Sequence, residues 1–336
     1  MSVEPSTAPT VGKAERIAFD PGHARRRGHV ESYFVKFTSP DAQRSLWLRW
    51  TILADGRNAP RAEIWAIAFR RGHRHVVAKR SMKLNATEML GTPGRLSFDT
   101  ATFDGSHAEG TVEGGDACIQ FDVKLFPRIG PLRQYPFEWM YRASVPEVKF
   151  TTPIPDAIAD GWYEVDGARI DVTGWRAMHG HNWGSRNSNR YAWCHAAGFD
   201  GADDVVFEHG SARLFKAGLE LPWLGVGFLF IDGAWVRFDA PRTIGASRSR
   251  VRIMEWSFEL EQGDWRVRGT ASATPDLVVG LHYWNPNAPT TYCLNSKLAR
   301  LELDVTGPRG QRRLCTNAAA FEIGWPSADH GIPMRA

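Results

Sequence analysis

The chain has 336 residues, of which 43% are hydrophobic and 23% charged, and its formal net charge is +4. This composition is ordinary for a soluble globular protein and excludes wholesale disorder, while the length predicts two domains. The basic surplus is small and partly local to Arg25, Arg26 and Arg27, so no nucleic-acid partner is expected.

Residues 1–27 are rich in Pro, Ser, Ala and Arg without periodicity, which predicts a disordered tail. From residue 28 onward, short runs of β-branched and aromatic residues alternate with turn signals. SLWLRWTIL ends at Asp55-Gly56, and AEIWAIAF ends at Arg71-Gly72. This pattern is typical of antiparallel strands. It predicts an N-terminal barrel over residues 28–145.

The stretch from Pro131 to Pro155 carries five prolines, which central strands tolerate poorly because proline lacks an N–H donor. We therefore predict a crossover linker over 146–160 and a second barrel over 161–336. Strand-like runs in the second half follow the order of the first at an offset of roughly 140 to 160 residues, which indicates duplication. The predicted fold is all-β, with two tandem lipocalin-like (calycin) antiparallel barrels. One large sandwich is the alternative.

The densest chemical motif is GWRAMHGHNWG at 174–184, followed by YAWCH at 191–195. Alternation along a strand puts the four residues Trp175, His179, His181 and Trp183 on one face. On the next strand it does the same for Tyr191, Trp193 and His195. Aromatic walls that carry imidazoles suit an apolar unsaturated ligand and proton transfer near neutral pH. The plainer alternative is that these side chains only fill the core.

The candidate catalytic residues are His181 and His195 as proton-handling groups, Asn182 as the residue that orients them, and Glu208 as an acid. Glu208 and Glu31 both lie in apolar strand context, where desolvation raises the pKa of a carboxyl group. The predicted pocket lies between or within the barrels, at the entry to the second one. Its candidate substrate-binding residues are Trp175, His179, Trp183, Tyr191, Trp193, Tyr33, Trp50 and Trp65.

Other classes lack sequence support. There is no G-x-S-x-G motif, no P-loop and no G-x-G-x-x-G that opens a helix, so we expect neither hydrolase nor nucleotide chemistry and no cofactor. A metal held by His179, His181 and His195 is a weaker alternative, because no carboxylate stands at matched spacing. We expect no bound metal.

The four cysteines Cys118, Cys194, Cys293 and Cys315 stand far apart without a C-x-x-C pair. The N-terminal segment MSVEPSTAPT lacks the apolar core of a signal peptide, and no apolar run approaches the about 18 residues of a membrane span. We therefore expect free thiols in a cytoplasmic protein without a membrane span.

Three motifs resemble the AttH-like and carotenoid 1,2-hydratase (hydroxyneurosporene synthase) superfamily, which is related to lipocalin-like Diels–Alderases and tocopherol cyclase. They are ESYFVK at 31–36, LWLRW at 46–50 and HNWG at 181–184. The resemblance implies two lipocalin-like barrels with a ligand site in or between them. Several members carry an acidic residue just before the HNWG histidine, where this chain has Gly180. That difference favours a cyclase, an isomerase or a binder over a hydratase.

The sequence thus predicts a cofactor-independent lyase or isomerase. It would hydrate, cyclise or rearrange an apolar unsaturated small molecule of terpenoid or polyketide type. A carrier or sensor that binds such a molecule without converting it is the alternative. A structural module with filled barrels is the third hypothesis.

Overall fold

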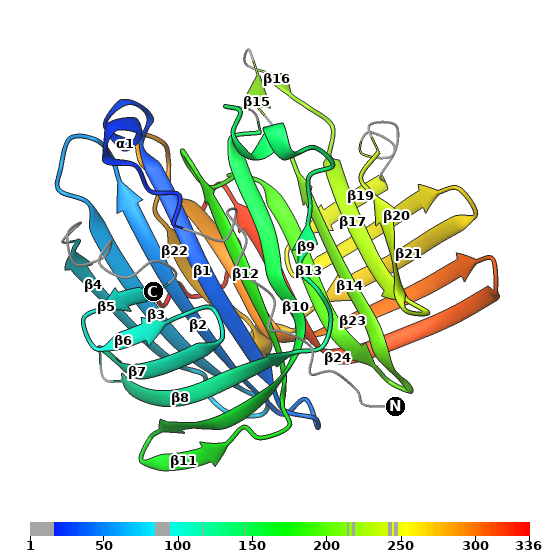
Figure 1. Cartoon of the computed structure of the whole chain (residues 1–336), viewed down its shortest axis with the longest axis horizontal. Helices are drawn as coiled ribbons and strands as arrows, with labels where there is room; N and C mark the ends of the chain where they lie inside the picture. Colours follow the sequence, from blue (N-terminus) through cyan, green and yellow to red (C-terminus); the bar gives the residue numbers. More distant parts are fainter. Residues whose placement is uncertain are drawn as a thin grey trace, which may run out of the picture.

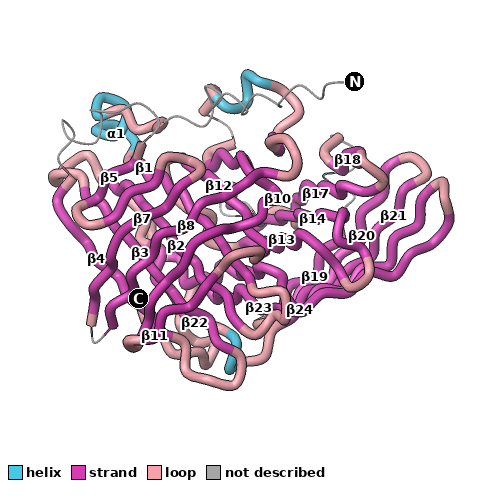
Figure 2. The backbone as a smooth tube through the Cα atoms, turned by 60° about the horizontal axis from the view of Figure 1, so that its bottom comes forward, coloured by secondary structure: helices cyan, strands magenta, loops and turns pink. Residues whose placement is uncertain are grey.

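The computed structural model describes residues 17–84, 95–115, 117–144, 146–213, 215–216, 219–240, 244 and 248–336. Almost all of the regular structure is antiparallel strand, so the all-β prediction is confirmed (Figures 1 and 2). The helical elements are α1 (Pro21–Arg27), η2 (Glu138–Tyr141) and η3 (Pro275–Leu277). No helix in the described segments is long and apolar enough to cross a membrane.

The first sheet contains the strands of the first half of the chain and continues past residue 160. Its strands are β1 (His29–Thr38), β2 (Arg44–Ala54), β3 (Arg61–Arg70), β4 (Val76–Lys83), β5 (Leu96–Phe98), β6 (Ala101–Phe103), β7 (His107–Gly114), β8 (Ala117–Pro127), β9 (Leu132–Arg133), β10 (Val148–Val165), β11 (Ala168–Asp171) and β12 (Arg176–Gly184). The main order is β4-β3-β2-β1-β12-β10-β8-β7-β6-β5. A Cβ atom on Gly114 of β7 would lie 2.2 Å from the backbone oxygen of Lys79 in β4. The sheet therefore curls until these two strands touch.

The second sheet repeats this arrangement. Its strands are β13 (Tyr191–Phe199), β14 (Ala202–Ala212), β17 (Leu224–Ile231), β18 (Ala234–Phe238), β19 (Arg248–Arg252), β20 (Glu255–Gln262), β21 (Trp265–Ser272), β22 (Val279–Tyr283), β23 (Thr291–Gly307) and β24 (Gly310–Trp325). Their main order is β18-β17-β14-β13-β24-β23-β21-β20-β19. Strand β12 beside β1 thus corresponds to β24 beside β13. A short hairpin, β15 (Phe215–Lys216) and β16 (Leu219–Glu220), stands apart.

The predicted linker over 146–160 is wrong, because most of it belongs to β10 in the first sheet. Pro153 and Pro155 sit where the register between β10 and β12 shifts, between Thr151 and Ala157. On its other edge, β10 pairs with β8 only from Ala157 onward. The missing N–H groups therefore break no regular ladder, since proline is tolerated at bulges. The first sheet ends at Gly184, and the second begins at Tyr191.

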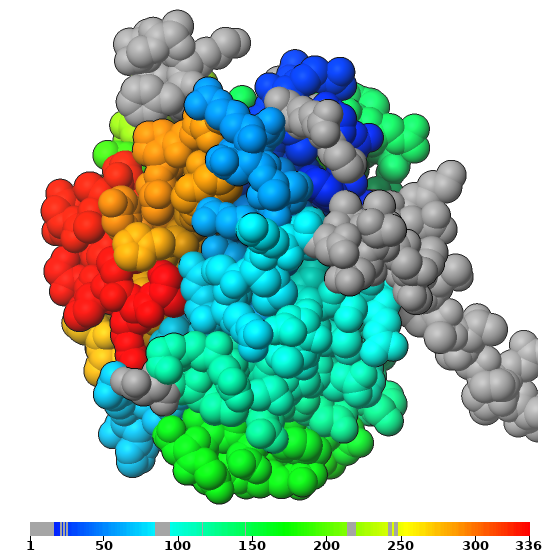
Figure 3. Space-filling view, turned by 90° about the vertical axis from the view of Figure 1, so that its left-hand side faces the viewer, coloured from blue at the N-terminus to red at the C-terminus, as the bar shows by residue number. Residues whose placement is uncertain are grey.

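The predicted tail over 1–27 lies mostly outside the described residues. Its described part contains α1, which corrects the prediction of disorder there. At the other end of the chain, Arg335 Nη1 donates a hydrogen bond of 3.0 Å to the backbone oxygen of His75, just before β4. Figure 3 shows this C-terminal segment, in red, against the light-blue strands of the first half.

Three buried clusters organise the molecule, and strand alternation assigns residues to them. Tyr33 and Val35 of β1 point into the interior of the first barrel, where they join Trp50 of β2. Phe34, between them in the chain, points the other way. It joins a cluster between the two sheets, here called the seam, whose residues are Phe34, Trp47, Trp65, Ile67, Phe69, Met178, Trp193, Leu277, Val279, Leu281, Tyr283, Cys293, Leu298 and Ala320. A third cluster fills the second barrel.

Candidate functional site

Four adjacent strands present a row of side chains to the interior of the first barrel. The ladder pairs Trp50 of β2 with Tyr33 of β1, Tyr33 with His181 of β12, and His181 with Thr151 of β10. Directly paired residues in an antiparallel ladder share a face. His181 therefore lies inside the first barrel and not in the seam.

Glu31, two residues before Tyr33, holds His181 in place. Glu31 Oε1 lies 3.0 Å from His181 Nε2, and both side chains are fully buried. The same carboxylate accepts hydrogen bonds from His29 Nε2 at 2.9 Å, from the Tyr33 hydroxyl at 2.9 Å and from the Ala18 N–H at 2.7 Å. An ionised carboxylate only accepts hydrogen bonds, so His181 carries its proton on Nε2 when neutral.

The charge state of Glu31 differs from the sequence expectation. Burial alone raises the pKa of Glu31, but hydrogen bonds and electrostatic interactions with His181 and His29 outweigh burial and set the pKa at about 2. Glu31 is therefore an ionised anchor for His181. It is not the protonated acid that its apolar context predicted.

Several polar atoms of this row have no partner in the described part of the chain. They are His181 Nδ1, Trp50 Nε1 and Thr151 Oγ1, and all three are buried. The His181 ring stacks on Tyr33 at 4.0 Å and on Trp183 at 4.5 Å between ring centroids. Buried polar groups normally have hydrogen-bond partners, so three open ones in one row indicate a place for a ligand or water.

His179 faces the same interior, but its Nδ1 atom already has a hydrogen-bond partner. Its Nδ1 lies 3.1 Å from the backbone oxygen of Phe34, and its ring meets Phe103 edge-on at 4.8 Å. Burial lowers the pKa of His179 to about 3, so the ring is neutral and donates its Nδ1–H to that carbonyl. His179 thus serves as an apolar wall beside His181.

The other predicted catalytic residues lie in the seam. Glu208 of β14 pairs with His195 of β13, on the face that carries Trp193. The Glu208 carboxyl group accepts hydrogen bonds from Thr152 Oγ1 at 2.8 Å, Gln134 Nε2 at 3.3 Å and Trp193 Nε1 at 3.1 Å. Desolvation raises the pKa of Glu208 to about 7, despite these three donors. Glu208 therefore links the first sheet to the second.

His195 is also held by the backbone. Its Nε2 lies 2.9 Å from the carbonyl oxygen of Pro155 in β10. Burial and the nearby charge of Lys36 lower its pKa to about 3, so His195 is neutral and donates to that carbonyl. It bridges the sheets in the same way as Glu208.

The structure thus divides the predicted site. The first-barrel interior contains Tyr33, Trp50, Trp175, His179, His181 and Trp183, whereas the seam contains Trp65, Tyr191, Trp193, His195 and Glu208. The structure therefore does not bring the predicted catalytic and substrate-binding residues together in one pocket. Asn182 follows His181 and points to the opposite face. Within the described residues, no hydrogen bond joins it to either histidine.

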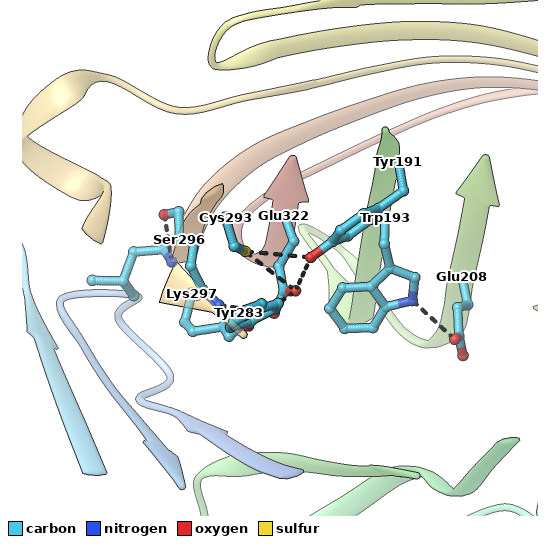
Figure 4. Close-up of polar contacts among 10 residues, drawn as sticks. Tyr191, Trp193, Glu208, Tyr283, Cys293, Ser296, Lys297 and Glu322 are labelled. Atoms are coloured by element: carbon cyan, nitrogen blue, oxygen red, sulfur yellow. Dashed lines mark hydrogen bonds and ion pairs between the residues drawn. The ribbon is translucent and has the colours of Figure 1, made fainter. Parts of the chain in front are cut away.

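Sequence reasoning missed a buried ionic network in the seam (Figure 4). Lys297 Nζ lies 2.7 Å from Glu322 Oε1, which also accepts from Asn295 Nδ2 at 2.8 Å. Glu322 Oε2 accepts from the hydroxyls of Tyr191 at 3.1 Å and Tyr283 at 3.4 Å. The sequence does contain a signal for this network. The alternation C-x-N-x-K at 293–297 places polar residues on one face of an otherwise apolar strand.

Gly180 explains why this chain has no acidic residue before the HNWG motif. A Cβ atom at position 180 would lie 2.2 Å from Phe34 Cζ, which is far inside contact distance. The position faces the seam, opposite to His181. A carboxylate there would therefore point away from the first-barrel interior.

No set of three His, Cys, Asp or Glu residues within the described ranges is arranged to hold a metal ion. The three histidines of the metal alternative are divided in the same way, with His195 apart from His179 and His181. All four cysteines are free. Two surface hollows of about 730 and 740 Å³ lie away from the His181 row.

No model of a known protein family matches the chain. An uncharacterized protein of Mycobacterium tuberculosis, found in two strains, is 22% identical over 308 residues, which is 91% of this chain and 90% of the relative.

Solved structures show the same architecture. A candidate AttH protein of Nitrosomonas europaea aligns with a TM-score of 0.56 at 12% identity, over 96% of this chain and 98% of that one. Kievitone hydratase from Nectria haematococca aligns with a TM-score of 0.52 at 9% identity, over 89% and 90%. The chain therefore has the tandem lipocalin-like fold of the AttH-like proteins, as its sequence motifs predicted.

Proposed function

We propose that the chain is a cofactor-independent lyase or isomerase that acts on an apolar, unsaturated small molecule inside the first barrel. The observation that carries this proposal is the open Nδ1 atom of His181, opposite an Nε2 that is fixed by the Glu31 carboxylate. A histidine held this way presents one free basic nitrogen in a defined direction, which general acid–base catalysis requires.

The charge of Glu31 supports the proton-transfer role. When Nδ1 takes a proton, the imidazolium that forms lies 3.0 Å from a carboxylate that is already ionised. The pair then carries no net charge, so the protonated state is stabilised in a buried site. His181 can next return the proton to a different atom of the substrate.

The chemistry balances for both reaction types. In hydration, the oxygen of water bonds to one alkene carbon while its proton passes to Nδ1, and His181 then gives a proton to the other carbon. In isomerisation, Nδ1 removes a proton from one carbon and returns it to another as the double bond shifts. The Trp50 N–H and the Thr151 hydroxyl are free to hydrogen-bond an oxygen of the substrate.

The walls favour an apolar substrate. The rings of Tyr33 and Trp183 both stack on the His181 ring, and Phe103 stacks on Trp50 at 5.2 Å. Aromatic faces bind unsaturated hydrocarbon and stabilise developing positive charge. The hydratase among the structures of the same fold gives further support.

The second candidate function is a carrier for the same class of molecule. It is favoured by the separation of His181 from His195 and Glu208, which leaves the predicted group of four catalytic residues unassembled. A carrier needs the aromatic walls and the open polar atoms but no proton transfer.

One experiment separates the two functions. Compounds that co-purify with the native protein are identified by mass spectrometry, and each is then incubated with fresh protein in D2O. Turnover predicts that the compound gains the mass of one water or incorporates deuterium on carbon. His181→Gln abolishes this gain, whereas the control His282→Gln, at an exposed histidine of β22, retains it. If the mass of every bound compound stays unchanged after incubation, the result contradicts the enzyme hypothesis and supports the carrier hypothesis.

A further inference from the structure

Two aromatic side chains stand out on the surface. Phe137 and Trp139 are 51% and 61% exposed, among only four large hydrophobic residues that are exposed in the described ranges. Their rings stack at 6.3 Å between centroids with an interplanar angle of 12°. Exposed aromatic pairs of this kind mark sites of interaction.

The turn that carries them is anchored from beneath. Arg133 Nη1 binds Glu138 at 2.5 Å, and the Arg133 guanidinium lies 4.6 Å from the Tyr141 ring centroid. The Tyr141 hydroxyl accepts the Tyr135 N–H at 3.1 Å. With η2 fixed in this way, the outward direction of Phe137 and Trp139 is built into the fold.

The aromatic pair lies at the same end of the molecule as α1 and the His181 site. Val30, near the start of β1, and Val148, at the start of β10, both pair with Gly184 at the end of β12. Figure 2 shows the two helical segments at this end. Tyr141 of the turn stacks on Trp183 at 6.0 Å, and Trp183 stacks on His181.

Positive charge accompanies the aromatic pair. Arg26 and Arg27 of α1 and Arg142 beside η2 are exposed. Helix α1 contains no acidic residue, although Asp20 directly precedes it, and the acidic residue of η2, Glu138, is already paired with Arg133. Exposed aromatic rings with flanking arginines are complementary to an anionic lipid surface, where Trp favours the headgroup region.

We propose that this end of the molecule docks on an anionic lipid bilayer, with Phe137 and Trp139 inserted among the headgroups and the arginines against the lipid phosphates. Two side chains cover far less than the about 800 Å² per partner of a stable protein interface, which favours lipid over protein. Docking would also deliver an apolar substrate to the His181 site, and this part of the inference rests on the proposed function. The docking itself does not depend on the proposed function.

The test is co-sedimentation of the full chain with vesicles of phosphatidylglycerol and phosphatidylcholine in equal parts. Wild type binds, and the double variant Phe137→Ser/Trp139→Ser loses about tenfold or more in partition coefficient, because two aromatic rings no longer leave water. Phe126→Ser removes an equally exposed ring on β8, outside the turn that carries Phe137 and Trp139, and leaves binding unchanged. Added salt weakens wild-type binding.

Absent binding of wild type, or equal loss in Phe126→Ser, overturns the proposal. So does equal binding to pure phosphatidylcholine, because charge complementarity is part of it. If this surface instead binds a protein partner, wild type should not bind the vesicles. The variant His181→Gln should bind vesicles like wild type, so the docking stands or falls separately from the proposed catalysis.

Discussion

His181 Nε2 lies 3.0 Å from Glu31 Oε1 inside the first barrel, and neither side chain is exposed to solvent. The two residues are 150 positions apart in sequence, yet their strands β1 and β12 are neighbours. The first barrel is complete only when β12 returns beside β1, so this contact joins the beginning and the end of the first sheet.

Glu31→Gln should destabilise the protein by about 3 kcal/mol at neutral pH, because the variant leaves buried donors without their anionic partner. The pKa of Glu31 is lowered from 4.5 to about 2, so its contribution is complete above about pH 4.5 and is lost as the pH falls toward 2. Urea unfolding near pH 7 and near pH 3 should therefore show a smaller difference between variant and wild type in acid.

The control for that series is Glu261→Gln, at an exposed pair with Arg266. It should change the free energy of unfolding by less than about 1 kcal/mol. A Glu31 variant as stable as this control would contradict the role of Glu31 as a buried anchor.

Glu208 should give the opposite pH dependence. Its pKa in the folded protein is raised from 4.5 to about 7, so the folded state favours the protonated form. Stability should fall as the pH rises from about 4.5 to about 7 and then level off, because over that range only the unfolded state has released the proton. Glu208→Gln should remove this slope and be the more stable protein near pH 8. If the slope persists in the Glu208→Gln variant, the pH dependence of stability comes from other groups.

The sequence predicted strands well because turn signals and alternation are local. It also indicated duplication, and both sheets do have the same strand order. It placed the boundary too early, because Pro153 and Pro155 read as breakers while the bulges that accommodate them depend on β8, β9 and β12. No local pattern encodes those partners.

The candidate site was only partly predictable for a related reason. Alternation correctly grouped His179 with His181 and Trp193 with His195. It could not assign either group to the barrel or the seam, because β1 and β12 have buried side chains on both faces. When both faces are buried, hydrophobicity no longer distinguishes inside from outside, and the assignment depends on the tertiary packing.

The seam network gives a third prediction. Lys297→Met keeps the side-chain volume but leaves the buried Glu322 carboxylate without its ammonium partner, so stability should fall by about 3–5 kcal/mol. Arg300→Met, on the same strand and paired with Glu302 near solvent, should cost less than about 1 kcal/mol. Thermal or urea unfolding of the two variants tests this contrast. Similar losses in both would mean that the buried pair has no special weight.

The contact between Phe34 and Gly180 gives a fourth prediction. Gly180→Ala places a Cβ atom 2.2 Å from Phe34 Cζ, so the ring must shift within a packed seam, at a cost of about 1–3 kcal/mol. Phe34→Leu shortens the side chain and by itself leaves a small cavity.

In the double variant Phe34→Leu/Gly180→Ala, the new methyl group occupies part of that cavity. The double variant should therefore be more stable than the sum of the single changes predicts, with a coupling of about 1 kcal/mol in a double-mutant cycle. Strict additivity would show that Gly180 is required for another reason. It would also remove the steric explanation for the absence of an acidic residue before His181.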